Sequence, residues 1–512
     1  FAQKMKGLIL MIICFDFSHA LSFTLGIDCG TQSTKAVVYD GKQIIGRGSC
    51  EHRLPESNGV QGRAEQNPND WIEAFYIAAG QALNGLEISK KIEAIGVSGQ
   101  QHGLVILDKE GAVIRPAKLW CDTESAQEAR ELSQAMGKKI VASFTITKLL
   151  WLKRNEPDNY ARIRTLLLPH DYINFHLTGE KTAEMSDASG TGLLDVHQRI
   201  WDKQACSLID DDVSSKLPRL ISSATNDIAG TLLPQVAERL GLKSGIPVAP
   251  GGGDNAMSAI GAGAVTQNRI VASLGTSGTL FAKTQDPVLD PTGIICPFLG
   301  AFGDGLPLLC TLNCGSIGEE IRKGYGLSRD EATNLARNER PGSLTILPYF
   351  LGERTPNWPH ATASILGLKS GDFAKPGKLY RAALEAATFS IMDGLNSLKY
   401  FDPNLQNADQ IRLVGGGSKN VLWRKIVADA FQMQVAIPTE AESAALGAAI
   451  QAAATVASIS GTDELASWVL QHHDAPVASF VDPEPQFKST YEDAFQRFKR
   501  AGHLLFANDL EN

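Results

Sequence analysis

The sequence predicts an α/β protein built from two lobes, and three observations support that fold class. From Ser22 onward, short apolar strands alternate with helical segments, the pattern typical of α/β domains. Two hairpin patterns, each carrying a Gly-Thr turn, stand about half the chain apart, at Gly30-Thr31 and Gly275-Thr276. The chain has 512 residues, of which 43% are hydrophobic, so it is long enough for two or three domains with sizeable cores.

The first lobe is expected to open with three antiparallel strands joined by tight turns. Short apolar runs predict these strands over Phe23–Ile27, Ala36–Tyr39 and Gln43–Arg47. A helix-start signal then precedes a predicted helix over Trp71–Leu86. A buried strand is predicted over Ile92–Val97, after which strands and helices alternate.

The second lobe is expected to repeat this opening. Arg269–Ser273 and Thr279–Ala282 predict a second hairpin around the Gly-Thr turn. A strand over Ile411–Val414 leads through a glycine-rich loop into a helix over Val421–Phe431. Near the end of the chain, Gln486–Phe506 predicts an amphipathic helix that packs back on the body.

These elements predict a domain division near residue 264, inside the small-residue segment 261–268. The first lobe would span residues 22–264, and the second lobe, with its C-terminal helix, residues 265–512. Residues 1–21 are interpreted as a leader or a vector remnant and are left out of the fold. A secretory signal is the alternative for that stretch, because a lysine precedes a short apolar run there.

Composition excludes several classes of protein. The chain has 48 basic and 56 acidic residues, a formal net charge of −8, whereas nucleic-acid binders need clustered Lys and Arg. No apolar run reaches the ~18 residues that a membrane span requires. The eight cysteines are scattered and form no CxxC pair, which favours reduced, structural thiols. We therefore expect a cytoplasmic protein without a nucleic-acid or membrane partner.

Two Gly-Thr turns have the chemistry of phosphate loops. In Asp28-Cys29-Gly30-Thr31, glycine lets the backbone approach a ligand, and the Thr31 hydroxyl can bind phosphate oxygens. Asp28 stands where a carboxylate could hold a hydrated Mg²⁺. Gly275 and Thr276 repeat the device in the second lobe, so two loops could close on one triphosphate. Ordinary hairpin turns are the alternative for each loop taken alone.

A third glycine-rich segment lies between the predicted strand and helix of the second lobe. Val414-Gly415-Gly416-Gly417-Ser418-Lys419-Asn420 leaves a flat opening in which an adenine base or a ribose could lie. The segment lacks the third glycine of a dinucleotide-binding GxGxxG motif, so we reject a Rossmann site.

Asp254 is the candidate general base. It follows three glycines in Gly251-Gly252-Gly253-Asp254-Asn255 and precedes a helix predicted over Ala256–Gly263. The dipole of that helix would stabilise a carboxylate at this point. An N-cap aspartate is the alternative, but a cap does not require the room that three glycines leave.

Polar residues after the strand Ile92–Val97 are candidates for ligand contact. Gln101 and His102 stand at the end of this buried strand, where side chains of α/β sheets face the ligand crevice. Trp120 is placed similarly, just before Cys121-Asp122. A structural histidine and a core tryptophan are the alternatives.

Taken together and in this order, the motifs identify the chain as similar to the FGGY family of sugar kinases, in the actin-like ATPase superfamily. The resemblance runs from about Phe23 to about Leu505 and is carried by eight segments. They are GIDCGTQSTKAVVYD, SGQQHG, LWCDTESAQEA, LPHDYINFHLTGE with SDASGT, GGGDNA, SLGTSG, LPYFLGERTP and LVGGGSKN. The resemblance implies two actin-like (ribonuclease H-like) lobes with a nucleotide and sugar cleft between them.

The resemblance also implies roles for individual residues. Asp254 matches the family's catalytic base and Asn255 the neighbouring substrate contact, while Gln101, His102 and Trp120 match further substrate positions. Asp28 matches an aspartate important for Mg-ATP. The positions that match ATP contacts are Thr31, Gly275, Thr276, Gly416, Gly417 and Asn420.

The reaction implied is the Mg-dependent transfer of phosphate from ATP to D-xylulose, giving D-xylulose 5-phosphate. A kinase for another ketopentose or polyol, such as D-ribulose, is the nearest alternative, and a non-catalytic actin-like ATP-binding module is another. The partners expected are the sugar and ATP, with a homodimer as the assembly if the chain oligomerises. Glu124 stands where the family often has arginine, which puts fine sugar selectivity in doubt.

Overall fold

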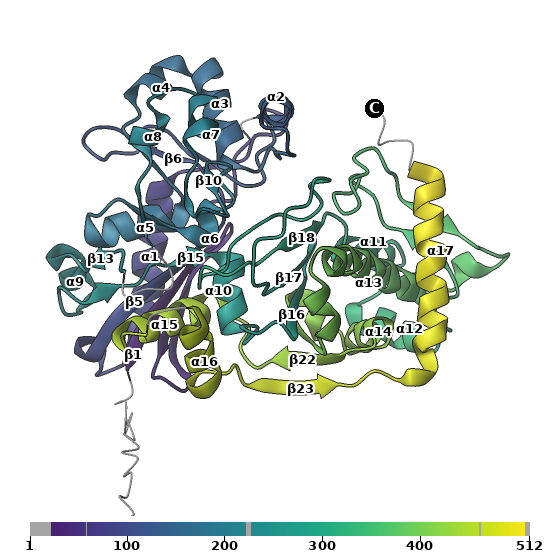
Figure 1. Ribbon diagram of the computed structural model, residues 1–512. Helices are drawn as coiled ribbons and strands as arrows, with labels where there is room; N and C mark the ends of the chain where they lie inside the picture. Colours follow the sequence, from purple (N-terminus) through teal and green to yellow (C-terminus); the bar gives the residue numbers. More distant parts are fainter. Residues whose placement is uncertain (1–21, 58, 222–226, 460–461, 507–512) are drawn as a thin grey trace, which may run out of the picture.

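The computed structural model describes residues 22–57, 59–221, 227–459 and 462–506, and it shows two α/β lobes side by side (Figure 1). The interpretation of residues 1–21 lies outside the described residues. Among those described, no helix is long and apolar enough to cross a membrane.

The first lobe is built on a sheet with the strand order β13-β14-β5-β1-β2-β3. β1 pairs antiparallel with β2 and parallel with β5, and β2 pairs antiparallel with β3. A short strand, β15, adds to the end of β5. The strands are β1 (Phe23–Cys29), β2 (Ser33–Tyr39), β3 (Ile44–Glu51), β5 (Ile92–Gly99), β13 (Gly230–Thr231), β14 (Pro247–Val248) and β15 (Gly252–Gly253).

The second lobe repeats the arrangement, with the strand order β18-β17-β16-β21-β22-β23. β16 pairs antiparallel with β17 and parallel with β21, as β1 does with β2 and β5. The two Gly-Thr turns therefore lie at equivalent positions, each joining the first hairpin of its lobe. The strands are β16 (Arg269–Leu274), β17 (Gly278–Ala282), β18 (Leu308–Thr311), β21 (Gln410–Val414), β22 (Gln434–Pro438) and β23 (Val477–Val481).

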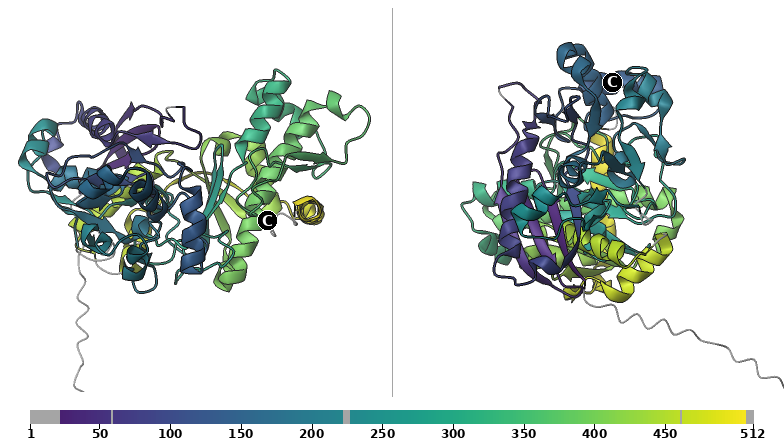
Figure 2. Two further views of the ribbon diagram at one scale, coloured as in Figure 1. Left: turned by 90° about the horizontal axis from the view of Figure 1, so that it is seen from above. Right: turned by 90° about the vertical axis from the view of Figure 1, so that its left-hand side faces the viewer.

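The predicted helices are present with small shifts at their ends. α1 (Pro68–Leu83) ends three residues before the predicted end, and its N-cap Asn67 accepts a hydrogen bond from the Asn69 amide. α14 (Val421–Phe431) has the predicted bounds. α10 (Asp254–Gly261) begins two residues earlier than predicted, so Asp254 is its first residue. α17 (Lys488–Phe506) lies along the outer side of the second lobe in Figures 1 and 2.

Between residues 105 and 188, the first lobe contains a largely helical segment and several short strands. The helices α2 to α4 lie at the top of this lobe in Figure 1. The elements are α2 (Ala126–Met136), α3 (Thr145–Asn155), α4 (Pro157–Arg162), β6 (Val105–Leu107), β8 (Thr165–Leu167), α5 (Pro169–Thr178), β9 (Thr182–Glu184) and α6 (Met185–Ala188). In the second lobe, α11 (Gly315–Gly324), α12 (Arg329–Arg337) and α13 (Pro376–Phe401) pack together beside the sheet.

One helix of the predicted second domain packs on the first lobe. The alanine-rich α15 (Ser443–Val456) follows β22 in the chain but lies against β1 and β5, and it packs on α10 (Figure 1). Glycine positions allow this close approach: a Cβ at Gly26 would lie 2.0 Å from the Ala445 carbonyl oxygen. The division of the sequence at residue 264 stays a prediction, and in space α15 packs across it.

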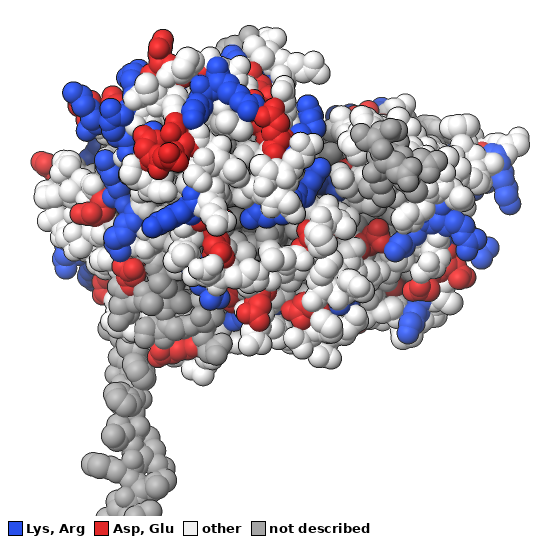
Figure 3. Space-filling model, turned by 45° about the horizontal axis from the view of Figure 1, so that its top comes forward, with Lys and Arg blue, Asp and Glu red and all other residues white. Residues whose placement is uncertain are grey.

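The state of the cysteines and the distribution of surface charge agree with what the composition predicts. The seven cysteines of the described segments are all free. On the face of the molecule in Figure 3, acidic and basic side chains are intermixed.

Candidate active site

The two candidate catalytic aspartates face one cavity between the lobes. Asp28 lies near the end of β1, and Asp254 begins α10, directly after β15. Because β1, β5 and β15 run parallel and end at the same edge of the sheet, the chain brings these residues together there. The cavity has a volume of about 270 Å³, and its wall also includes Ser273, Gly415 and residues 441–444, which lead into α15 (Ser443–Val456).

Two carboxyl groups crowd this cavity, and both have pKa values above the ordinary range. Burial raises the pKa of Asp254 to about 8, and the nearby carboxylates of Asp28 and Asp187 add to the rise. Burial also raises the pKa of Asp28, although the Ser98 hydroxyl donates a hydrogen bond of 3.0 Å to its Oδ1. At the rim, Lys35 of β2 pairs with Glu442 at 2.7 Å. A divalent cation would therefore fit beside Asp28, since it would relieve the repulsion between two crowded carboxyl groups.

Asp254 does not cap its helix. The N-cap of α10 is Gly253, which has no side chain to offer, and Asp254 occupies the first helical position. Its Oδ1 accepts hydrogen bonds from the backbone and side-chain amides of Asn255, at 2.8 and 3.2 Å. Asp254 itself lines the cavity, and the geometry argues against the capping alternative; its role as a base stays a prediction.

Gln101 and Asn255 form a direct link between two of the predicted sugar-binding segments. Asn255 Nδ2 donates to Gln101 Oε1 at 2.7 Å. This bond fixes the amide of Gln101 beside Asp254. His102 follows and is buried, with its ring packed against Phe144 of the first lobe and Phe298 of the second.

Trp120 and Thr31 lie together, and neither lines the aspartate cavity. The Trp120 indole donates to Thr31 Oγ1 at 3.0 Å, and the Thr31 hydroxyl donates to Gln100 Oε1 at 3.0 Å. Trp120 remains 42% exposed. In this arrangement the Thr31 hydroxyl links Trp120 to the first phosphate turn, and its contact with phosphate stays a prediction.

The other predicted ATP residues line one large cavity in the second lobe. Its volume is about 930 Å³, and its wall includes Gly275, Thr276, Gly416, Gly417 and Asn420. Consecutive residues of the same two loops line the smaller aspartate cavity, so a ligand filling both would pass between them.

This two-lobed geometry agrees with the comparison to known proteins. Models of the FGGY family of carbohydrate kinases match residues 23–261, as the N-terminal domain, and residues 270–456, as the C-terminal domain. The chain belongs to the FGGY family of carbohydrate kinases. The fold class predicted from the sequence, two actin-like α/β lobes, is thereby confirmed.

Individual relatives cover nearly the whole chain. The chain is 41% identical to the xylulose kinase of Haemophilus influenzae over 450 residues, which span 84% of this chain and 90% of that protein. The crystal structure of a xyloylose kinase from Brucella ovis matches with a TM-score of 0.86 and 33% identity, covering 94% of this chain and 99% of that chain. A gluconate kinase from Lactobacillus acidophilus matches with a TM-score of 0.83 at 23% identity, covering 95% and 98%. The last likeness shows the fold alone, so the fold does not select the sugar.

The structure of this FGGY kinase adds residues of the large cavity that no sequence pattern predicted. Ser316, at the start of α11, lines the large cavity, and its buried hydroxyl has no hydrogen-bond partner among the described residues. Lys323 and Arg337 line the same wall, which also carries the acidic residues Glu319, Glu320 and Asp330. In the sequence, the glycine before Ser316 was the one signal for these cavity residues. Lys323 and Arg337 lie on α11 and α12 and belong to no recognisable motif. Asn420 caps α14 and also donates to Thr333 at 3.0 Å, so it has a structural role besides its place in the wall.

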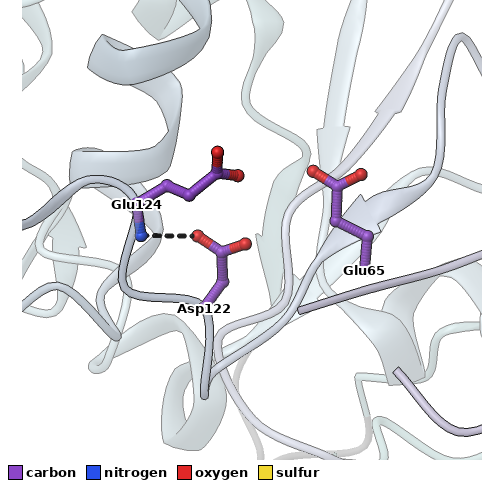
Figure 4. Close-up of side chains that lie close together, drawn as sticks. All are labelled: Glu65, Asp122 and Glu124. Atoms are coloured by element: carbon purple, nitrogen blue, oxygen red, sulfur yellow. Dashed lines mark hydrogen bonds between the residues drawn. The ribbon is translucent and has the colours of Figure 1, made fainter. Parts of the chain in front are cut away.

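A cluster of carboxylates in the first lobe resembles a metal site but already has cationic side chains as partners. Glu65, Asp122 and Glu124 lie close together (Figure 4). The buried Lys118 ammonium lies 3.1 Å from Glu65 and 3.2 Å from Asp122, and it also contacts Glu124. Arg63 pairs with Glu124 at 2.9 Å, and the guanidinium of Arg115 lies 2.6 Å from Glu65. Arg115 also pairs with Glu156 at 3.0 Å, so three cations hold four carboxylates in one ion-pair network. Glu124, where the family often has arginine, belongs to this network.

Proposed function

We propose that this carbohydrate kinase transfers the γ-phosphate of ATP to O5 of D-xylulose, with Asp254 as the general base. The observation that carries the proposal is the shared cavity of Asp28 and Asp254, which opens beside Gln101 and Asn255 and meets the nucleotide cavity. The similarity to xylulose kinases over most of the chain supports D-xylulose as the sugar. Since the reaction consumes ATP, we also propose a cytoplasmic enzyme.

Asp254 is suited to accept the proton of the attacking hydroxyl. One of its oxygens is held by Asn255, which fixes the carboxylate without capping the helix. A pKa near 8 matches the operating pH of a general base better than that of an ordinary aspartate. Asn255 and Gln101 present amide groups next to it, where they would orient the sugar hydroxyls.

The nucleotide would lie with its adenosine in the large cavity and its γ-phosphate toward the aspartates. The loops at Gly275-Thr276 and Gly416-Gly417 line that path, and Ser316 with Lys323 offers a hydroxyl and a positive charge to the phosphates. Asp28 is the residue that would hold Mg²⁺, through water or directly. Bound there, Mg²⁺ would neutralise charge on the transferring phosphoryl group.

A substrate panel tests the proposal. The purified protein is assayed for ADP release with Mg-ATP and D-xylulose, D-ribulose, D-gluconate, glycerol or no sugar, and the product is located by ³¹P NMR. We expect the highest kcat/KM for D-xylulose and a 5-phosphate product. A higher kcat/KM for another sugar would reject D-xylulose, and sugar-independent ADP release at the full rate would reject the kinase reaction.

A further inference from the structure

Three buried ionisable side chains form a continuous chain from the interior of the first lobe to the sugar side of the site. His170 lies in α5, Asp187 in α6 and His102 in the turn after β5. His170 Nδ1 lies 3.3 Å from Asp187 Oδ2, and His102 Nδ1 lies 3.1 Å from Asp187 Oδ1. Both His170 and Asp187 are fully buried. Neither was singled out as a site residue, although both stand in motifs that the sequence analysis quoted.

Asp187 contacts both the ring and the backbone of His102. Its Oδ1 lies 3.1 Å from the ring Nδ1, a close charge contact outside hydrogen-bond geometry. Its Oδ1 also accepts a hydrogen bond from the His102 backbone N–H, at 3.1 Å. His102 has a positive φ of 61°, a conformation that non-glycine residues rarely adopt and that needs support from its surroundings. On the other side of the residue, the Thr145 hydroxyl donates to the His102 carbonyl at 3.1 Å. Asp187 therefore stabilises the backbone turn as well as the ring.

The charge on Asp187 determines which ring nitrogen of His102 carries the proton. The lone pairs of an ionised carboxylate repel the lone pair of a bare ring nitrogen only 3.1 Å away, so the ring nitrogen beside Asp187 is the one that carries the proton. Burial lowers the pKa of His102, which keeps its ring neutral at neutral pH. A neutral ring with a proton on Nδ1 has a free lone pair on Nε2, which can accept a hydrogen bond from a sugar hydroxyl.

His170 keeps Asp187 ionised. Burial acts to lower the pKa of His170, but Asp171, with Oδ1 3.0 Å from Nε2, and Asp187 overcome it and hold the pKa well above its usual value. Burial likewise acts to raise the pKa of Asp187, yet the two histidines beside it hold that pKa below the ordinary value. A buried imidazolium beside a buried carboxylate is a stable arrangement only while both partners are present.

The His102 ring has little freedom to turn away from this geometry. A Cβ at Gly190 would lie 1.8 Å from His102 Cε1, so the ring lies directly on the Gly190 backbone. Phe144 and Phe298 pack against it, with ring centroids 5.9 and 4.9 Å away.

We propose that Asp187 and His170 are positioning residues that hold His102 as its Nδ1–H tautomer, so that Nε2 accepts a hydrogen bond from a hydroxyl of the sugar. The part of the inference that concerns the sugar rests on the proposed function, whereas the tautomer is a property of the unliganded protein.

Two measurements test the inference on Asp187→Asn and His170→Gln. The first is a long-range ¹H–¹⁵N spectrum of ¹⁵N-histidine-labelled protein without ligand, with the His102 signals assigned by their loss in His102→Gln. We expect the Nδ1–H tautomer of His102 in the wild type and a loss of that preference in Asp187→Asn. The asparagine amide is neutral and can donate as well as accept a hydrogen bond, so it no longer requires a proton on the ring nitrogen that faces it. The second is steady-state kinetics, in which the KM for D-xylulose should rise about tenfold or more while the KM for ATP stays unchanged, because one buried hydrogen bond is lost or misdirected.

His176→Gln is the matched control. His176 lies on the same helix, α5, but its Nε2 is hydrogen-bonded to the Tyr76 hydroxyl, at 2.9 Å. We expect it to leave both the His102 spectrum and the KM for D-xylulose unchanged.

Each outcome decides the inference. An Nε2–H tautomer of His102 in the wild type would overturn it, as would an unchanged KM for D-xylulose in folded His170→Gln and Asp187→Asn. If Asp187→Asn does not fold, the wild-type spectrum and His170→Gln still decide. A wild-type protein that shows the Nδ1–H tautomer but ignores D-xylulose would reject the proposed substrate and support the positioning role.

Discussion

Replacing Asp254 by asparagine tests the catalytic base most directly. The asparagine side chain would keep the size of the aspartate, and its amide oxygen could still accept the bond from the Asn255 backbone, but it cannot take a proton at neutral pH. Because Gly253 and not Asp254 caps α10, the helix should be unaffected. The cavity would lose one of its two crowded carboxylates, so the variant should be at least as stable as the wild type.

The expected loss follows from the role of a general base. Such groups contribute about 10²- to 10⁴-fold, so kcat should fall within that range or further. The wild type also carries a signature of the base in its pH profile. With a pKa of about 8, Asp254 is deprotonated in roughly a tenth of free molecules at pH 7, so kcat/KM should rise about tenfold from pH 7 to 9.

The assay combines kinetics, binding and melting. ADP release with D-xylulose gives kcat and kcat/KM, calorimetric titration gives the Kd values of sugar and nucleotide, and a thermal melt reports folding. Asp158→Asn serves as a matched control, because Asp158 also lies in the first turn of a helix but is exposed and lines neither cavity.

The reasoning is refuted by a folded Asp254→Asn protein whose kcat is within a few-fold of the wild type. It is also refuted if the mutant binds neither substrate, since the loss would then reflect a damaged site rather than a missing base. A wild-type kcat/KM that falls between pH 7 and 9 would contradict the raised pKa.

Three further predictions follow from the same geometry. Asp28→Asn should reduce kcat strongly at saturating Mg-ATP. Because the Asp28 charge helps to raise the pKa of Asp254, the substitution should also move the pH profile of kcat/KM to lower pH. An unmoved profile would show that the charge of Asp28 does not influence the pKa of Asp254. Gly416→Leu should raise the Kd for ATP at least about tenfold, equivalent to about 1.4 kcal/mol, and leave the Kd for D-xylulose unchanged. Gly416 lines the proposed nucleotide cavity and nothing lies within 4 Å of a Cβ there, so the leucine side chain would occupy the cavity without disturbing the protein around it. Gly26→Ala should lower the free energy of unfolding by about 1–3 kcal/mol or more, since its Cβ would collide with a backbone oxygen of α15, whereas Gly80→Ala on the exposed face of α1 should be neutral or stabilising by up to about 1 kcal/mol; equal effects in a urea titration would contradict the close contact.

Local patterns in the sequence predicted the positions of the main strands and helices and the segments that meet around the aspartate cavity. The alternation of apolar residues and the turn signals placed β1, β2, β16 and β17 to within a few residues. Glycines at strand ends, one after Asp28 and runs of three at Asp254 and Gly416, marked these segments, because a backbone that must approach a ligand closely has few alternatives to glycine. These features depend on neighbours in the chain, and so they can be read from it.

The tertiary structure alone decided the features that depend on contacts between distant segments. Nothing local assigns α15 to the first lobe, because an alanine-rich helix can pack on any surface that is free of large side chains, and only the fold brings Gly26 to it. Ser316 and Lys323 enter the nucleotide cavity through the orientation of α11, and Asp187 reaches His102 from a helix 85 residues away. The sequence by itself determined which residues carry the carboxylates, imidazoles and hydroxyls that the candidate site uses. Their burial arises only when the chain folds and excludes water, and with it come the raised pKa of Asp254 between the lobes and the charge of the His170–Asp187 pair inside the first lobe.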